Sequence, residues 1–214
     1  MKKIIEDFKH GHHEFENGHL DEFEANDPFK IFESWITEAT NSKEVEPNAF
    51  VLSTVNSIGE PNSRILYLKD VIENEFVFYT NYESQKGREL IGNPNVSMLF
   101  FWPNGSRQIR ISGVCEKVKS EISDDYFNSR PRSSKIGAWA SKQSEEVENR
   151  KVIEDQVSFY ESKFEDEVPR PDFWGGYKIK PTKFEFWQGR PSRLHDRLVF
   201  KENKGIWNYH RINP

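Results

Sequence analysis

The last quarter of the chain holds cationic and titratable residues at a spacing that could bind an anion. Arg193, His195 and Arg197 occur at every second position. Side chains of a β-strand alternate between its two faces, so this spacing predicts a strand that carries all three on one face. Positive groups on one face repel each other unless an anion lies among them. The segment therefore predicts an anion-binding wall on a sheet, and phosphate is the anion we expect.

A second candidate anion site lies where a strand passes into a helix. Ser84 is a typical helix N-cap, and Lys86 follows it in the first turn. The unpaired N–H groups and the positive dipole end of a helix N-terminus suit phosphate. An ordinary capped helix with a solvated lysine accounts for the same residues, so the sequence leaves both interpretations open.

Arg64 and Lys69 could add charge to such a site. Five positions separate them, and an odd separation points two side chains of a regular strand to opposite faces. Both can serve one site only if Lys69 lies past the strand end or a bulge intervenes. Two solvated charges that flank a buried strand are the alternative, which these two residues taken alone favour.

A third group combines hydroxyl and guanidinium donors. Tyr126, Arg130 and Ser134 are spaced i, i+4 and i+8, and Pro131 lies between the last two. They share a helix face if the helix continues through Pro131, and they converge at a turn if it breaks there. Arginine and serine donors suit phosphate oxygens. We therefore favour a binding function for this group over a surface helix end.

The composition excludes several classes of protein. The chain of 214 residues carries 30 Lys+Arg against 35 Asp+Glu, a net charge of −5, whereas general nucleic-acid binders are usually basic. The single Cys115 excludes an intramolecular disulfide, suits the cytoplasm and reads as a small, half-buried strand residue. We expect no membrane span, signal peptide or metal site, and no hydrolase triad or dinucleotide fingerprint is evident.

The elements that must position these residues follow from periodicity and turn chemistry. We expect a flexible polar arm over residues 1–25, with one domain over 26–214, and Ser144 reads as the N-cap of the clearest helix. Short successive strands with helices outside them predict a barrel or a strongly curled sheet. The expected helices are 27–42, 84–91, 120–140 split by Pro131, and 144–165, and the expected strands are 49–56, 62–69, 75–81, 96–102, 107–118, 174–180, 182–188, 195–201 and 204–209.

These segments together resemble the pyridoxamine 5′-phosphate oxidase family. The similarity runs in order from about Asp27 to Pro214. The matching segments are RILYLK (64–69), FYTN (78–81), RQ (107–108), YFNSRPR (126–132), SKIGAW (134–139), SKQS (141–144), FWGG (173–176), EFWQG (185–189) and RLHDR (193–197).

The resemblance implies a mainly β (α+β) fold, the FMN-binding split β-barrel with peripheral helices. It implies a cytoplasmic homodimer with two flavin sites at the subunit interface. Such an enzyme, a pyridoxal 5′-phosphate synthase of vitamin B6 biosynthesis and salvage, oxidises pyridoxamine or pyridoxine 5′-phosphate to pyridoxal 5′-phosphate. Molecular oxygen reoxidises the flavin and gives hydrogen peroxide.

The resemblance also implies which residues form the site. Arg193 and His195 would act as the catalytic pair that positions the substrate and tunes proton movement near its C4′ atom, from which a hydride equivalent passes to flavin N5. The implied FMN contacts are Arg64, Lys69, Tyr79, Thr80, Lys86, Gln108, Gln143, Ser144, Trp187 and Arg197. The implied substrate contacts are Lys69, Tyr126, Arg130, Ser134, Arg193 and His195.

Two departures from the family pattern matter. Where the family often has Arg-Lys after the capping serine, this chain has Gln85 and Lys86, so we expect one charge fewer on the FMN phosphate and weaker FMN binding. The family's N-terminal segment carries an Arg-x-x-Tyr-type stretch that can cover the substrate. Here residues 11–15 read Gly-His-His-Glu-Phe, which does not match it.

Two other functions compete with the oxidase. A split-barrel flavin oxidoreductase with another substrate need not retain Tyr126, Arg130, Ser134, Arg193 and His195, which are intact here. A non-catalytic pyridoxal-phosphate-binding protein could keep the phosphate pocket and lose flavin contacts. The sequence leaves open the preference between the two substrates and any second pyridoxal-phosphate site.

Overall fold

A computed structural model describes residues 15, 20 and 27–214, which group into two compact units. Unit 1 comprises the described residues before position 49 together with 99–111 and 182–214, and unit 2 comprises 49–98 and 112–181. The arm expected over residues 1–25 lies outside the described residues, apart from Phe15 and Leu20. Strands β5, β6 and β7 each contribute residues to both units.

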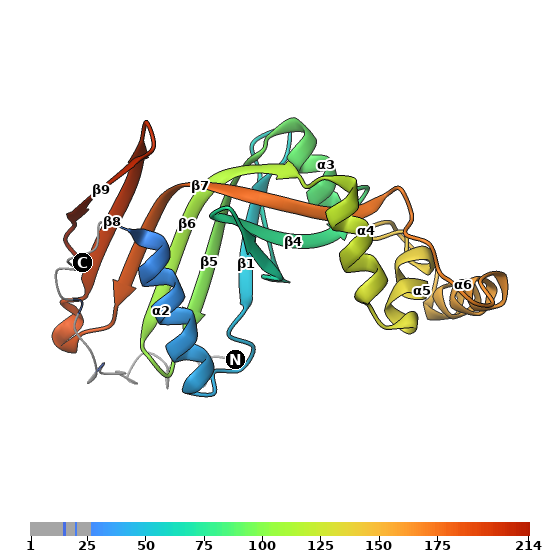
Figure 1. Cartoon of the computed structure of the whole chain (residues 1–214), viewed down its shortest axis with the longest axis horizontal. Helices are drawn as coiled ribbons and strands as arrows, with labels where there is room; N and C mark the ends of the chain where they lie inside the picture. Colours follow the sequence, from blue (N-terminus) through green and yellow to red (C-terminus); the bar gives the residue numbers. More distant parts are fainter. Residues whose placement is uncertain (1–14, 16–19, 21–26) are drawn as a thin grey trace, which may run out of the picture. The chain divides into compact units, whose positions relative to one another are not determined.

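The described chain is mainly β, as predicted (Figure 1). The strands are β1 Ala49–Val55, β2 Pro61–Tyr67, β3 Asp70–Ile72, β4 Glu75–Asn81, β5 Asn95–Trp102, β6 Arg107–Lys117, β7 Trp174–Gln188, β8 Asp196–Asn203 and β9 Ile206–Arg211. The helices are α2 Pro28–Asn41, α3 Gln85–Gly92, α4 Ser120–Ser129, α5 Arg132–Ala140 and α6 Arg150–Lys163, with a 3-10 turn, η1, over Pro191–Arg193. None of these helices is long and apolar enough to cross a membrane.

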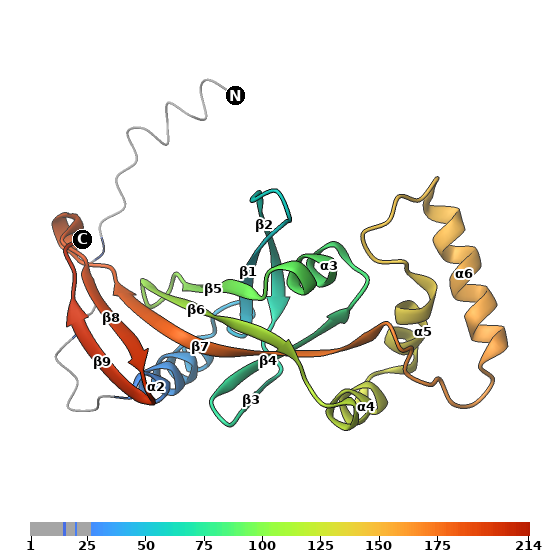
Figure 2. The ribbon, with the colours of Figure 1, turned by 90° about the horizontal axis from the view of Figure 1, so that it is seen from above.

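In unit 2, strand β4 leads into helix α3 and forms the strand-to-helix passage predicted to bind an anion. The hydrogen-bonded strands of the described chain follow the order β2-β1-β5-β6-β7-β4-β3, and β8 pairs with β7 and β9. Along β1 every second side chain is buried, which is the pattern of a strand with one face in the core. Strand β4 pairs antiparallel with β7, so that Tyr79 lies opposite Gly176 and Thr80 opposite Gly175. Figure 2 shows α5 and α6 side by side in this unit, and rings from both helices pack together there.

In unit 1 the helix α2 covers the strands. Asp27 caps it by accepting a hydrogen bond from the Phe29 N–H at 3.0 Å, and Pro28 stands in the first turn. The apolar face then packs its rings edge-on against the sheet, Phe32 on Phe100 at 5.4 Å and Trp35 on Phe186 at 5.3 Å. The predicted cap and apolar face are both confirmed.

Two element predictions were wrong, and one strand was missed. The segments 174–180 and 182–188 form one strand, β7, which passes through Pro181 without a break. The long helix begins at Arg150 and is capped by Asn149, whose side chain accepts from the Val152 N–H at 3.3 Å, so Ser144 lies too far before the helix to cap it. Strand β3 was not expected, because three residues show too little alternation to be recognised.

Cys115 lies in β6, as predicted, but it is buried rather than half-buried. Burial, followed by the charge of Glu116, raises the pKa of its thiol far above the usual value. The helical stretch 120–140 breaks at Pro131, also as predicted, into α4 and α5.

Candidate active site

The passage from β4 into α3 forms the first anion-binding cluster. Ser84 caps α3, and its hydroxyl accepts from the Gly87 N–H at 3.4 Å. The Lys86 side chain folds back over this cap, where its Nζ donates to Ser84 Oγ at 3.1 Å and to Thr80 Oγ1 at 3.2 Å. Lys86 is buried, and burial together with the charge of Arg64 lowers its pKa to about 8, although Glu89 opposes the shift. A buried ammonium group beside a helix N-terminus fits a phosphate.

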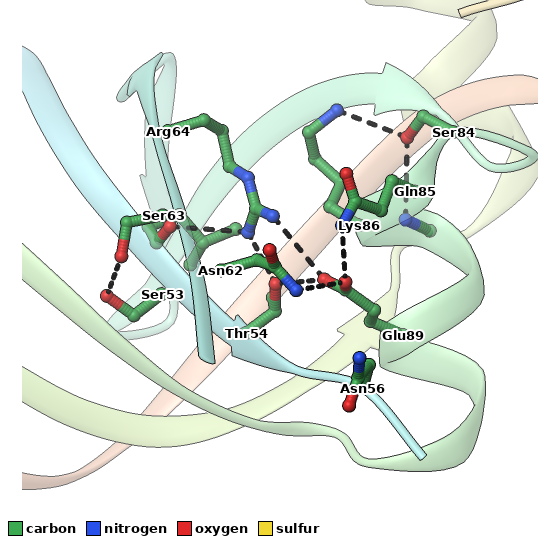
Figure 3. Close-up of polar contacts among 12 residues, drawn as sticks. Ser53, Thr54, Asn56, Asn62, Ser63, Arg64, Ser84, Gln85, Lys86 and Glu89 are labelled. Carbon is green, nitrogen blue, oxygen red and sulfur yellow. Dashed lines mark hydrogen bonds and ion pairs between the residues drawn. The ribbon is translucent and has the colours of Figure 1, made fainter. Parts of the chain in front are cut away.

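Arg64 reaches the same cluster from β2 (Figure 3). Its Nη1 donates to the Leu52 carbonyl at 3.3 Å and to the Thr54 hydroxyl, and its Nη2 donates to Glu89 at 3.4 Å. Burial opposes ionisation of Glu89, but hydrogen bonds from Thr54 and Gln85 and the charge of Arg64 outweigh it and lower its pKa. The cluster therefore holds two cationic groups and one carboxylate.

Gln143 contacts this cluster and also lines a cavity near Arg130 and Ser134. Its Oε1 accepts from Thr80 Oγ1 at 3.2 Å and from the Asn81 N–H at 3.4 Å. Gln143 also lines a cavity of about 340 Å³ together with Arg130 and Ser134. Of the two arrangements left open for Tyr126, Arg130 and Ser134, the helix break at Pro131 is the one observed, and Arg130 and Ser134 line this cavity whereas Tyr126 does not.

Arg130 is the notable group in the cavity wall. Its guanidinium carbon lies 4.6 Å from the centre of the Trp174 ring. Its Nη1 is buried and has no hydrogen-bond partner among the described residues. A buried, unpaired guanidinium nitrogen is costly unless an anion accepts from it. The geometry therefore fits an anionic ligand in this cavity.

Tyr79 and Tyr126 lie on the other face of β4 from Thr80. Their rings stack with centres 3.8 Å apart, and the Trp174 ring, whose centre lies 5.6 Å from that of Tyr79, is nearly parallel to it. Burial, followed by the charge of Asp70, raises the pKa of Tyr79 to about 12. The stack offers a flat aromatic wall next to the Arg130 cavity, which Trp174 also lines.

Lys69 lies past the end of β2, as required if it shares a site with Arg64. Strand β2 ends at Tyr67, and the Lys69 N–H donates to the Val77 carbonyl at 2.9 Å. Its exposed ammonium group lies 5.3 Å from the centre of the Tyr67 ring. No contact in the described chain brings it to Lys86 or Arg130. Ser144 is likewise exposed.

Unit 1 holds the remaining candidates, and one prediction about them was wrong. The strand face predicted for Arg193, His195 and Arg197 does not form, because Arg193 lies in the turn η1, His195 precedes β8, and β8 begins only at Asp196. The left-handed φ values of Ser192 (56°) and Arg193 (60°) reverse the chain there. The Arg193 side chain is exposed.

His195 packs against aromatic rings in unit 1. Its ring centre lies 4.6 Å from that of Trp187 and 5.4 Å from that of Phe15. Its Nδ1 accepts from the Arg190 N–H at 3.1 Å, so that the proton of the neutral ring lies on Nε2. Burial, followed by the charge of Arg193, lowers the pKa of His195. Apart from Phe15, the segment 11–15 lies outside the described residues.

Arg197 is anchored by protein groups. Its Nε and Nη2 both donate to Glu185 Oε1, at 3.0 and 2.6 Å, and its Nη1 donates to the Asn213 carbonyl at 3.1 Å. Trp187 lies directly opposite Arg197 across the β7–β8 ladder. Gln108 lies half-buried in β6.

Sequence reasoning missed three members of the first cluster, namely Thr54, Asn62 and Glu89. Glu89 accepts from Asn62 Nδ2 at 2.8 Å and from Gln85 Nε2 at 3.0 Å. Its spacing of four residues from Gln85 was a usable signal, since residues at i and i+4 adjoin on a helix. Thr54 and Asn62 gave none, because strand pairing brings them in.

Comparison with known proteins agrees with this geometry. Residues 36–163 match the pyridoxamine 5′-phosphate oxidase family, and residues 174–214 match the pyridoxine 5′-phosphate oxidase C-terminal dimerisation region. A pyridoxine/pyridoxamine 5′-phosphate oxidase of Cupriavidus metallidurans is 50% identical over 191 residues, which are 89% of this chain and 90% of that protein. Its counterpart in Bordetella pertussis is 48% identical over 202 residues, 94% of this chain and 96% of that protein.

Two solved structures share the fold. PhzG from Burkholderia lata, in complex with tetrahydrophenazine-1-carboxylic acid, superposes with a TM-score of 0.85 at 27% identity and covers 92% of this chain and 100% of its own. A pyridoxamine 5′-phosphate oxidase-related, FMN-binding protein from Nostoc punctiforme has a TM-score of 0.70 at 16% identity, with 88% and 98% coverage. The predicted split β-barrel fold is therefore confirmed.

Proposed function

Because this chain belongs to the pyridoxamine 5′-phosphate oxidase family, we propose that it oxidises pyridoxamine 5′-phosphate and pyridoxine 5′-phosphate to pyridoxal 5′-phosphate. Molecular oxygen is the electron acceptor and hydrogen peroxide the second product. The enzyme serves vitamin B6 biosynthesis and salvage. We place it in the cytoplasm, in keeping with its single cysteine.

The observation that carries this proposal concerns Arg130, which lines a cavity and whose buried Nη1 has no hydrogen-bond partner in the part of the chain that the structure describes. A guanidinium in this state is suited to a phosphate group, which accepts several charge-assisted hydrogen bonds at once. Ser134 lines the same cavity and can add a hydroxyl donor. We assign this cavity to the phosphate of the substrate, with Tyr126 and Lys69 as further contacts.

The cofactor is FMN, and the first cluster fits its phosphate. Arg64 and Lys86 supply positive charge, and the Ser84 cap and the first turn of α3 supply hydroxyl and N–H donors. Tyr79, Thr80, Gln85, Gln108, Gln143, Ser144, Trp187 and Arg197 are the further FMN contacts that we propose. When bound, the flavin supplies the acceptor for the two electrons removed from the substrate.

Arg193 and His195 are the residues that we assign to the reacting end of the substrate. His195 is fixed by the hydrogen bond from the Arg190 N–H and by the ring of Trp187. Its lowered pKa favours the neutral imidazole, which can donate a hydrogen bond from Nε2 and can accept a proton only on Nδ1, once the Arg190 N–H has moved away. We propose that it holds the substrate and moves a proton near C4′, while the Arg193 guanidinium orients the ring.

The C-terminal match to a dimerisation region implies a homodimer. We propose that the two flavin sites lie at the subunit interface, so that each site draws residues from both copies. This follows the family, and it would be tested by the mass of the protein in solution with and without FMN.

A second candidate function is the flavin-dependent oxidation of a substrate other than a pyridoxine derivative. The structural similarity to PhzG supports considering it. The set of Tyr126, Arg130 and Ser134 favours the phosphorylated substrate, since it offers more donors than the two oxygens of a carboxylate require. A non-catalytic pyridoxal-phosphate-binding protein is a third possibility. It requires the FMN cluster to be non-functional, and Lys86 and Arg64 are in place.

The test is to load the purified protein with FMN and to add pyridoxamine 5′-phosphate in air. We expect flavin absorption bands, an aldehyde product and stoichiometric peroxide, and little turnover of unphosphorylated pyridoxamine. Bound flavin without turnover would point to another substrate. Failure to bind FMN would favour the binding protein.

A further inference from the structure

Glu89 is a buried carboxylate within the cluster that we assign to the FMN phosphate, and neither sequence reasoning nor the family resemblance gives it a role. Each of its two carboxylate oxygens accepts two hydrogen bonds. Oε2 accepts from Thr54 and Arg64, and Oε1 accepts from Asn62 and Gln85. Its side chain is 5% exposed, so these four donors fix its position.

The contacts of Arg64 show what this carboxylate does to the guanidinium. A guanidinium carries five N–H donors in a rigid planar fork. Nη1 is engaged by the Leu52 carbonyl and the Thr54 hydroxyl, and one side of Nη2 is engaged by Glu89. In the described part of the chain, the Nε–H and the second Nη2 N–H carry no protein partner. Nε and Nη2 lie on one edge of the guanidinium, and such an edge can donate to two oxygens of a phosphate.

Thr54 completes the arrangement, because its hydroxyl accepts from Arg64 Nη1 and donates to Glu89 Oε2. The carboxylate, the hydroxyl and the guanidinium therefore form a closed ring of contacts. Figure 3 shows Arg64 and Lys86 on the same side of Glu89, and the charge of Arg64 contributes to the lowered pKa of Lys86. The free edge of Arg64 and the Lys86 ammonium group thus serve one anion.

We propose that Glu89 is a positioning residue for the FMN phosphate. It holds Arg64 so that the Nε–Nη2 edge stays free for two phosphate oxygens, and it fixes this edge before the cofactor arrives. The inference rests on the proposed function, since it takes the first cluster as the FMN phosphate site. Preorganised donors bind more tightly than mobile ones, because the ordering cost is met in folding.

An opposing effect must be separated from positioning. Glu89 is negative and repels a phosphate, so its neutralisation alone would tighten binding. The two effects are distinguished through Arg64→Lys, because a lysine keeps the charge but has no fork to orient. In that background only the repulsion remains.

The experiment measures FMN and riboflavin binding to the apoprotein by quenching of flavin fluorescence. Riboflavin is the same flavin without the phosphate. We expect Glu89→Gln to weaken FMN binding about tenfold, the effect of roughly one charge-assisted hydrogen bond, and to leave riboflavin binding unchanged. In the Arg64→Lys background the same change should give no loss or a gain. If Glu89→Gln does not fold, Thr54→Val opens the same ring of contacts and should weaken FMN binding alone.

Several results would overturn the proposal. Equal losses for FMN and riboflavin would show damage to the fold, and equal losses in both Arg64 backgrounds would show that Glu89 does not act through Arg64. Tighter FMN binding by Glu89→Gln would show that repulsion dominates. If the unsubstituted protein binds FMN and Glu89→Gln changes nothing, only this inference fails. If the unsubstituted protein binds neither flavin, the proposed function fails with it.

Discussion

Gln85 and Glu89 are joined by a hydrogen bond of 3.0 Å from the side-chain amide to the carboxylate, one turn apart on α3. The amide at this position therefore lies beside the phosphate cluster without adding charge to it. The family resemblance leads us to expect an arginine at this position. In this chain Gln85 instead supplies one of the donors that hold Glu89 in place.

Replacement Gln85→Arg should tighten FMN binding. An arginine can keep the contact with Glu89 and direct its other donors to the phosphate, so we expect the dissociation constant to fall about tenfold. Fluorescence titration of the apoprotein measures it, with riboflavin as the phosphate-free comparison. Gln85→Met, which has similar length and no charge, should not tighten binding. An unchanged constant for Gln85→Arg would show that residue 85 does not face the phosphate.

FMN binding should weaken above pH 8. The pKa of Lys86 is lowered to about 8 in the free protein, and a bound phosphate favours the charged form, so the pKa is higher in the complex. FMN affinity is therefore highest below pH 8, where Lys86 is protonated, and it falls as the pH rises above 8. We expect binding about tenfold weaker at pH 9 than at pH 7.

The control for this pH dependence is Lys86→Arg. Arginine does not titrate in this range, and the phosphate completes its second ionisation near pH 6, so the variant should show constant affinity between pH 7 and pH 9. A tenfold loss that persists in Lys86→Arg would assign the titration to another group.

Removal of the Arg130 guanidinium should weaken binding of the phosphorylated substrate. We expect Arg130→Ala to raise KM for pyridoxamine 5′-phosphate roughly 10- to 100-fold, the range for loss of a charge-assisted contact. Activity with unphosphorylated pyridoxamine should not change. Arg132→Ala is the matched control, because Arg132 is exposed and donates to the carbonyls of Phe164 and Asp166 instead. Steady-state kinetics that give both variants the same KM would remove Arg130 from the site.

His195→Asn should slow the reductive half-reaction. The amide can keep an acceptor near the Arg190 N–H, but it cannot exchange a proton near neutral pH, so we expect flavin reduction to slow by tenfold or more. Anaerobic stopped-flow absorbance of the flavin measures this rate directly. His210→Asn, at an exposed position in β9, should leave it unchanged. If neither kcat nor KM changes in His195→Asn, the catalytic assignment is wrong.

The first turn of α3 needs a glycine at position 87. A Cβ there would lie 1.9 Å from the Tyr82 carbonyl oxygen, and backbone cannot easily yield. We expect Gly87→Ala to lower the free energy of unfolding by about 1–3 kcal/mol and to weaken FMN binding. Gly92→Ala, at the end of the same helix, meets nothing within 4 Å and should be neutral or slightly stabilising. Urea unfolding of the two apoprotein variants measures this difference in the free energy of unfolding.

Much of the fold could be predicted because local chemistry marks its boundaries. Strand β4 ends at Asn81, and Ser84 caps the next helix, where the turn residues predicted both. Arg193 was misplaced because its alternation with His195 imitates a strand, whereas Pro191 and the left-handed residues after it make a turn. Periodicity cannot register a left-handed φ in a residue other than glycine.

The candidate site was predictable where the residue type itself indicates anion binding, as for the cationic side chains of Arg130 and Lys86. Glu89 was missed for a physical reason. A carboxylate in an anion site looks unfavourable from the sequence, and its value lies in donors that strand pairing brings from β1 and β2. Such a role depends on register rather than on local spacing.

The burial of Cys115 matters for the oxidase reaction that we propose, because its second product would be hydrogen peroxide. Peroxide oxidises the thiolate form of cysteine, and does so where the sulfur can be reached. The only thiol of this chain is enclosed in β6 and held in its protonated form. The fold thus keeps its one oxidisable sulfhydryl apart from the oxidant that each proposed turnover would generate.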